Sequence, residues 1–276
     1  IASEFASQYP ETFRIIDKQN GGWGSTVNRG IEEASGKYFK LLDGDDYFCE
    51  ENLDDYLEWL EITDADLIIT PFEIIDDKKG TVLKKVEYTL ESKIESKLYT
   101  KIVEKYDLSM HSCTIRTRLL KENNVKITEK CFYTDNEYMF FVGSVIRTYS
   151  YFNRVIYCYR YGNEGQSISL NSRITHYKDH ERVTFNILDL YKKFNGNKAI
   201  KKALESKLIE VVISQYIIYW ALPCSKENKK QIVYFDNKIK HADNELYYSI
   251  NANIIRIARL FKFNMYRLFH WYVQKK

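Results

Sequence analysis

Three carboxylates, Asp43, Asp45 and Asp46, lie within four successive positions at the end of an apolar run. The run KYFKLLD (37–43) has the composition of a buried strand, so the carboxylates lie at the carboxyl end of that strand. Carboxylates this close repel one another and are costly to desolvate, and a bound divalent cation relieves both effects. Oxygen ligands suit Mg²⁺ or Mn²⁺, and open α/β sheets bind ligands at their carboxyl ends. A solvated acidic turn is the alternative, since Asp and Gly are common turn residues.

The elements around these carboxylates alternate between short apolar runs and helical periodicity. The predicted strands cover 13–17, 37–43, 66–75, 113–117 and 155–161, and the predicted helices cover about 24–35, 51–62 and 134–147. This alternation predicts an α/β sheet. Helical periodicity dominates after about residue 173, so we expect a domain boundary near 170, with an α/β domain over 1–170 and a mostly helical region over 171–276.

A turn rich in glycine precedes the acidic strand. The segment NGGWGSTVNRGIEEASGKYFKLLDGDD (20–46) resembles the inverting family 2 glycosyltransferases of bacteria, whose pattern is Asn-x-Gly-x-Gly-x-x-x-Asn-x-Gly-Ile, then Ala-x-Gly-x-Tyr, then Asp-x-Asp-Asp. The matching positions are Asn20, Gly22, Gly24, Asn28, Gly30, Ile31, Ala34, Gly36, Tyr38, Asp43, Asp45 and Asp46. A dinucleotide-binding turn does not fit, because Val27 stands where a third glycine is needed, and no P-loop Gly-Lys-Ser/Thr follows.

The resemblance implies a GT-A type fold, in which a mixed sheet binds a nucleotide-sugar. It also implies a metal-dependent, inverting transfer of a sugar to a hydroxyl of a glycan or lipid-linked acceptor, as in cell-surface polysaccharide synthesis. The expected donor is a UDP-sugar, and the expected cofactor is Mg²⁺ or Mn²⁺ with Asp45 as a ligand. The donor contacts carried over from the family are Asn20, Gly22, Asn28, Asp43, Asp45 and Gln166. Turn and cap chemistry is the alternative for the two asparagines.

An inverting transfer needs a carboxylate that takes the proton of the acceptor hydroxyl. The family places this base after an aromatic residue at the start of a helix, and the matching segment here is EKCFYTDNEYMFF (129–141). Asp135 takes the position of the base. Thr134 stands where many relatives carry Glu, so Glu137 is the nearest substitute carboxylate. Capping of the helix by Thr134 or Asp135, with Glu137 in the first turn, is an alternative that is compatible with catalysis.

Weaker matches to the same family lie elsewhere in the chain. The resemblance of VIYCYRYGNEGQSIS (155–169) implies that Arg160 reaches a phosphate and that Gln166 lies over the donor. Asp46 is expected behind the ligands or near the acceptor, and His111 near the acceptor side, although a lone His is more often structural. The family's first strands have no match here, so we expect roughly 60 further residues before Ile1, a fraction of a typical domain. The activity of the fragment alone stays open.

The charge of the chain is concentrated at its end. The formal net charge is +3, and residues 251–276 carry six cations and no acid, so the other 250 residues carry −3. A mildly acidic body argues against a nucleic-acid-binding protein. Helical periodicity over 254–274 separates a polar from an apolar face. The polar face is expected to hold Arg256, Arg259, Lys262, Arg267, His270 and Gln274.

Such a helix suits a membrane interface, where anionic lipid attracts the cations, or the packing of its apolar face on the preceding helices. No run of 18 apolar residues occurs, so no spanning helix is predicted. Because the family often uses lipid-linked acceptors, we expect a cytoplasmic protein, peripheral on the inner face of the membrane. The competing function is a non-catalytic membrane-surface or scaffold protein that uses the basic C-terminal helix.

Overall fold

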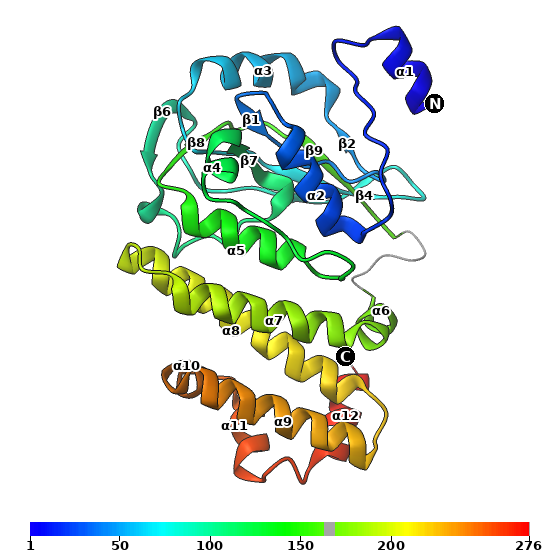
Figure 1. Cartoon of the computed structure of the whole chain (residues 1–276), viewed down its shortest axis with the longest axis vertical. Coiled ribbons are helices and arrows are strands. Elements are labelled where there is room, and N and C mark those ends of the chain that lie inside the picture. Colours follow the sequence, from blue (N-terminus) through cyan, green and yellow to red (C-terminus); the bar gives the residue numbers. More distant parts are fainter. Residues whose placement is uncertain (163–168, 276) are drawn as a thin grey trace.

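The computed structural model describes residues 1–162 and 169–275. Two mixed sheets with helices around them form the first part of the chain, and helices alone form the rest (Figure 1). The strands are β1 (Tyr38–Phe39), β2 (Tyr47–Phe48), β3 (Leu67–Ile69), β4 (Phe72–Asp76), β5 (Val82–Val86), β6 (Lys93–Leu98), β7 (Cys113–Arg116), β8 (Thr148–Tyr151) and β9 (Tyr157–Tyr161). The helices beside them are α1 (Ala2–Gln8), α2 (Gly22–Glu33), α3 (Leu53–Ile62), α4 (Thr117–Glu122) and α5 (Asp135–Val145), with short 3-10 helices η1 (Glu50–Asn52), η2 (Tyr99–Lys101) and η3 (Met110–Ser112).

Each sheet contains one parallel pair of strands among antiparallel ones. The five-stranded sheet has the order β1-β7-β3-β8-β6, with β3 and β8 parallel, and the four-stranded sheet has the order β2-β9-β4-β5, with β4 and β9 parallel. The predicted strand over 66–75 is therefore two strands, β3 and β4, in different sheets. Pro71 lies between them, and it has no amide hydrogen to continue a ladder.

The strand predicted at 13–17 is wrong. That segment is extended but unpaired with any described strand, and the side chains of Phe13, Ile15 and Ile16 are exposed. An apolar run forms a strand only where a neighbouring strand takes up its backbone hydrogen bonds, which sequence pattern alone does not reveal. The strand expected over 37–43 is likewise shortened to β1, because only Tyr38 and Phe39 pair with β7.

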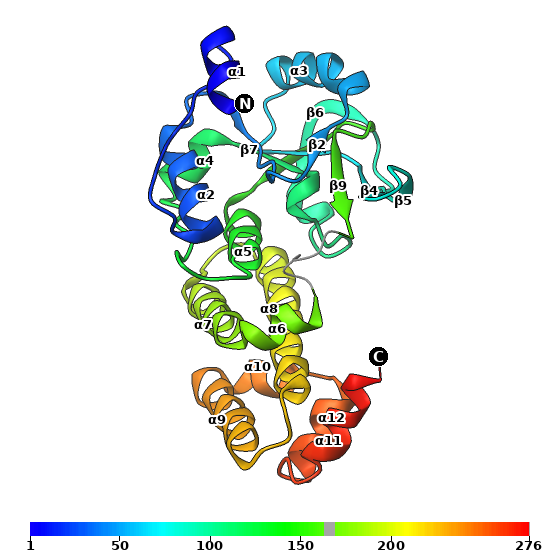
Figure 2. The ribbon, with the colours of Figure 1, turned by 90° about the vertical axis from the view of Figure 1, so that its right-hand side faces the viewer.

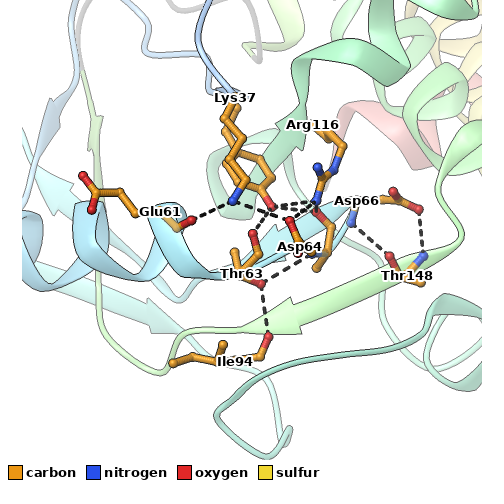
Figure 3. Close-up of polar contacts among 10 residues, drawn as sticks. Lys37, Glu61, Thr63, Asp64, Asp66, Ile94, Arg116 and Thr148 are labelled. Atoms are coloured by element: carbon orange, nitrogen blue, oxygen red, sulfur yellow. Dashed lines mark hydrogen bonds and ion pairs between the residues drawn. The ribbon is translucent and has the colours of Figure 1, made fainter.

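A polar network lies at the end of the five-stranded sheet where α3 leads into β3 (Figure 3). The Tyr38 hydroxyl donates to the carbonyl oxygens of Thr63 and Ala65, at 3.1 and 2.8 Å. The Asp66 carboxylate accepts the backbone N–H groups of residues 147 and 148, and the Asp66 N–H donates to the Thr148 hydroxyl at 3.0 Å. These bonds connect the starts of β1, β3 and β8. They therefore help to fix the position of β1 and of the acidic segment that follows it.

The helical region is stacked on the sheets through α5. It contains α6 (Leu170–Thr175), α7 (Tyr177–Lys193), α8 (Lys198–Ala221), α9 (Lys226–Ala242), α10 (Asn244–Ser249), α11 (Asn253–Leu260) and α12 (Tyr266–Gln274). One continuous apolar core runs from the five-stranded sheet through α5 into α7, α8 and α9. The views at right angles show α9–α12 at the end of the molecule away from the sheets (Figures 1 and 2). None of the described helices is long and apolar enough to cross a bilayer.

The single C-terminal helix predicted over 254–274 is two helices. Lys262 and Phe263 have positive φ angles of 50° and 58°, which end α11 before α12 begins. The polar face predicted for the helix is also divided. His270 Nδ1 lies 2.9 Å from the Trp220 carbonyl oxygen, and the Gln274 amide donates to the Ala221 carbonyl, so these side chains face the bundle.

Arg259 is the third polar side chain that turns inward. Its Nε donates to Asp236 Oδ1 at 2.7 Å, and its guanidinium lies over the Tyr247 ring at 3.6 Å. Asp236 is buried and also accepts the hydroxyls of Tyr216 and Tyr247, at 2.6 and 3.1 Å. This network ties α11 to α8 and α9.

We expect Arg259→Ala to lower the free energy of unfolding by about 3–5 kcal/mol, because it leaves the buried Asp236 carboxylate without its cation. Urea unfolding followed by tryptophan fluorescence measures this loss. Arg256→Ala is the matched control, since Arg256 is exposed and donates to Asn251, and it should change stability by less than about 0.5 kcal/mol. Equal losses in the two variants would contradict the anchoring role of Arg259.

Candidate functional site

A cavity of about 870 Å³ lies where the sheets meet the helical region. It is bounded by the start of α2, the acidic segment after β1, η3 and the start of α5. His176, Asp179 of α7 and Lys207 of α8 complete its wall. Among the residues singled out from the sequence, this cavity brings together Asn20, Gly22, Asp43, His111 and Asp135. These positions span over a hundred residues of sequence, so only the fold makes them neighbours.

An acidic group lies at one side of the cavity, where ligand atoms of Asp43, Asp46 and His111 are all within 4.8 Å of one another. Each of the two carboxylates accepts hydrogen bonds from neighbouring residues. Asp43 Oδ1 accepts the Trp23 indole N–H at 2.9 Å, and Asp46 accepts the Tyr157 hydroxyl at 2.5 Å and the Arg160 backbone N–H at 2.8 Å. The two carboxylates are thus fixed as a pair by α2 and β9.

His111 completes this group from η3. Its ring lies between aromatic side chains, with centroids 4.8 Å from those of both Tyr157 and Tyr159. Its Nδ1 is 2.7 Å from the Ser109 hydroxyl, which leaves Nε2 as the nitrogen open to a ligand. Burial and the nearby Lys40 ammonium lower the pKa of His111 to about 4, so the imidazole is neutral at physiological pH.

The electrostatics of the group suit a divalent cation. Burial raises the pKa of both Asp43 and Asp46, and the neighbouring carboxylates raise it further, against the hydrogen bonds from Trp23 and Tyr157. Two carboxylates and a neutral imidazole held this close form a ligand set that a cation such as Mn²⁺ or Mg²⁺ fits. Asp45, which lies between Asp43 and Asp46 in the sequence, is not a member of this group, and its side chain is exposed to solvent.

Asp135 lies on the cavity wall at the first residue of α5. Its carboxylate lines both the main cavity and a second cavity of about 320 Å³ beside it. Surrounding protein raises the pKa of Asp135, with a contribution from Asp43, while the Lys207 ammonium on α8 lowers it. The residue still reaches solvent through the cavities, which limits the shift. A carboxylate of raised pKa beside a cavity is suited to accept a proton.

Glu137 and Thr134 have structural positions that the sequence left open. Glu137 is buried and accepts the backbone N–H and the hydroxyl of Thr128, both at 3.0 Å, and the Asn186 amide at 3.4 Å. It therefore anchors the loop before α5 and does not line the main cavity. Thr134 is the N-cap residue of α5 and Glu137 lies in the first turn, as the capping alternative expects, but the Thr134 side chain makes no capping hydrogen bond.

The turn before α2 is shaped by the two asparagines. Asn20 Oδ1 accepts the Gly22 N–H at 2.9 Å, and Gly22 has a φ angle of +77°, which favours glycine. Asn28 exchanges two hydrogen bonds with the backbone of Ile127, at 2.7 and 2.8 Å, and thereby clamps α2 to the loop over 125–129. Asn20 lines the main cavity, whereas Asn28 lines a neighbouring groove.

The remaining sequence candidates lie outside the cavity or outside the described residues. The Arg160 guanidinium contacts Asp77, with Nε 2.7 Å from Oδ1, and its side chain does not line the main cavity. Arg160 contributes to the site through its backbone N–H, which holds Asp46. Gln166 lies outside the described residues.

Several residues of the cavity were missed from the sequence. Trp23 occupies a variable position of the glycine-rich turn, and only its hydrogen bond to Asp43 identifies it. Lys207 comes from the helical region, where it pairs with Asp107 at 2.7 Å beside Asp135. Phe132 stacks on His176 at a centroid distance of 3.6 Å and forms part of the wall. None of these carries a local sequence signal, since each is defined by a partner far along the chain.

Comparisons of the sequence with known proteins find glycosyltransferases. Residues 1–124 match the model of glycosyl transferase family 2. An uncharacterized glycosyltransferase of Methanocaldococcus jannaschii is 26% identical over 153 residues, which are 55% of this chain and 50% of that protein. An uncharacterized glycosyltransferase of Rickettsia conorii is 34% identical over 80 residues, which are 28% of this chain and 13% of that protein. The chain thus spans half or less of the length of these curated relatives.

The fold is shared with solved structures of S. aureus TarS 1-349. One of them superimposes with a TM-score of 0.65 at 16% identity and covers 99% of this chain and 79% of that one. The complex of the same protein with UDP-GlcNAc gives a TM-score of 0.61 at 17% identity, over 88% of this chain and 70% of that one. The predicted mixed α/β fold of GT-A type with a helical C-terminal region is thereby confirmed.

Proposed function

We propose, from the match of residues 1–124 to glycosyl transferase family 2, that this chain transfers a sugar from a nucleotide-sugar to an acceptor hydroxyl with inversion at the anomeric carbon. The observation that carries this proposal is that one cavity is lined by Asp43 and His111, which lie beside Asp46, and also by Asp135. A donor diphosphate needs a cation held by the acidic group, and a hydroxyl nucleophile needs a base such as the Asp135 carboxylate.

In this proposal Asp43, Asp46 and His111 hold a divalent cation, and Asp45 contacts the donor or the cation from the exposed side. A Mg²⁺ or Mn²⁺ ion there supplies positive charge that offsets the charge of the leaving diphosphate. Trp23, Tyr157 and the Arg160 N–H keep the carboxylates in place, so little reorganisation is needed when the donor binds.

Asp135 acts as the general base. Its carboxylate accepts the acceptor's hydroxyl proton while the hydroxyl oxygen attacks the anomeric carbon, and the bond from that carbon to the diphosphate oxygen breaks. One displacement of this kind inverts the anomeric carbon. Lys207 lines the same cavity, and its ammonium lowers the pKa of Asp135 against the rise that burial causes, which favours the ionised form that can accept a proton.

The donor in this proposal is a UDP-sugar, and UDP-GlcNAc is the first to test because a TarS crystal structure contains it. The acceptor is a glycan or lipid-linked hydroxyl of the cytoplasmic side of the membrane. Turn residues Asn20 and Gly22 border the donor side of the cavity, and Asn28 supports the same turn from outside.

The proposal predicts that the chain binds UDP-GlcNAc when Mn²⁺ is present and loses that binding in EDTA. Calorimetry measures the affinity, and release of UDP measures slow hydrolysis with water as the acceptor. Quenching of Trp23 fluorescence should accompany binding, and Trp23→Phe should remove that signal, because the indole contacts Asp43. If no UDP-, GDP- or CDP-sugar binds in the presence of Mn²⁺, the proposed function is wrong.

A further inference from the structure

The last two helices each carry large apolar side chains that are exposed on the side away from their buried face. The buried sides of α11 and α12 contain Ile255 and Ala258, and Phe269 and Val273, respectively. The opposite sides hold six large apolar side chains with exposed fractions of 44–76%, which we name the C-terminal apolar patch: Ile257, Leu260, Phe261, Leu268, Trp271 and Tyr272.

The spacing of these residues gives each helix a second stripe. Residues 257, 260 and 261 are neighbours on one face of α11, and residues 268, 271 and 272 are neighbours on one face of α12. A helix that is apolar on two sides is normally buried on both. Six large apolar side chains that reach solvent within 16 positions are therefore the kind of surface that marks an interaction site.

The charged residues of the segment that carries the patch, 251–276, have one sign. Arg256, Lys262, Arg267 and Lys275 are exposed, and the sequence over 251–276 contains no acid. Lys275 Nζ lies 3.9 Å from the centroid of the Trp271 ring, so cation and apolar surface are interleaved. Arg259, another cation of this segment, is paired with the buried Asp236 and does not belong to this exposed set.

We propose that the C-terminal apolar patch binds the surface of an anionic lipid bilayer. The apolar side chains would enter the boundary between headgroups and acyl chains, and the four cations would contact anionic headgroups. The absence of acids in 251–276 fits a lipid surface of uniform negative charge. The cores of protein interfaces, by contrast, are depleted of charged residues. The helices that carry the patch, α11 and α12, lie at the end of the molecule away from the sheets (Figure 2).

The test is sedimentation of the full chain with vesicles of phosphatidylcholine alone or mixed with phosphatidylglycerol. We expect binding to the mixed vesicles only, and weaker binding at high salt, because the attraction is partly electrostatic. Leu260→Glu and Trp271→Glu should each weaken binding by at least about tenfold, since each removes apolar area and adds a repelling charge.

Two variants of equal chemistry serve as controls. Leu57→Glu, on α3, and Tyr234→Glu, on α9, replace side chains that are also more than half exposed but lie outside the patch. Both should sediment like the wild type, and all four variants should keep the wild-type melting temperature and donor binding. The proposal fails if the wild type does not bind the mixed vesicles or if the patch variants bind as well as the controls. It also fails if light scattering shows that the patch variants abolish a dimer, because the patch would then be an interface between protein chains.

Discussion

Asp135→Asn is expected to lower the rate of sugar transfer by about 10²–10⁴-fold and to leave donor affinity unchanged. The amide has the shape of the carboxylate but accepts no proton from the acceptor hydroxyl. Asp135 also stands apart from the acidic group that would hold the cation, so its loss should not disturb donor binding. Single-turnover release of UDP from bound donor measures the rate, and calorimetry with UDP and Mn²⁺ measures the affinity.

Asp179→Asn is the matched control for this variant. Asp179 is a carboxylate on the wall of the same cavity, but it contacts His176 and the Phe132 N–H. The same change of charge there should lower the rate by less than about tenfold, since no proton transfer is lost. If the two variants lose similar amounts of rate, the loss comes from the changed charge of the cavity, and Asp135 is not the base.

The dependence of the wild-type rate on pH provides a second test of Asp135 as the general base. The base works when ionised, so the rate should fall as the pH falls through the pKa of Asp135. Because burial raises that pKa, the acidic limb should lie above the ordinary aspartate value of about 3.9. Rates measured at saturating Mn²⁺ should show this limb in the wild type, and it should be missing from the residual activity of Asp135→Asn.

The second large effect is expected from the acidic group. Asp43→Asn and His111→Gln should each weaken Mn²⁺ binding in the presence of UDP by roughly 100-fold, since even residues that only support metal ligands typically contribute 10–100-fold. Asp43 follows β1 and His111 belongs to η3, and each variant leaves two of the three members of the group in place. Electron paramagnetic resonance of free Mn²⁺ measures the affinity directly, without any need for turnover.

Asp54→Asn, a change of an exposed carboxylate on α3, controls for the net charge and should leave Mn²⁺ affinity unchanged. Asp45→Asn tests separately whether the exposed member of the acidic segment reaches the cation or the donor. Unchanged Mn²⁺ affinity in both Asp43→Asn and His111→Gln would remove the metal site from this part of the structure.

The resemblance to family 2, whose model matches residues 1–124, was carried by short segments of the sequence. Turn glycines, an acidic strand end and a helix that begins at Asp135 are all features of short segments, and their residue types follow from the backbone and charge requirements at those positions. The fold class and the order of the larger elements followed from hydrophobic periodicity. The failures were also informative: residues 13–17 have the composition of a strand but no partner, and the helix predicted over 254–274 is interrupted at Lys262 and Phe263.

The tertiary structure decided which of these residues work together. Ser109, His111 and Trp23 carry no sequence signal for a cation site, and His111 joins Asp43 and Asp46 only because η3 packs beside β9. Lys207 reaches the wall near Asp135 only because α8 stacks on α5. Local sequence determines what a segment can do chemically, since caps, turns and charges act over a few residues. The site itself depends on contacts between segments about a hundred residues apart, and their energies are set by packing that no single segment contains.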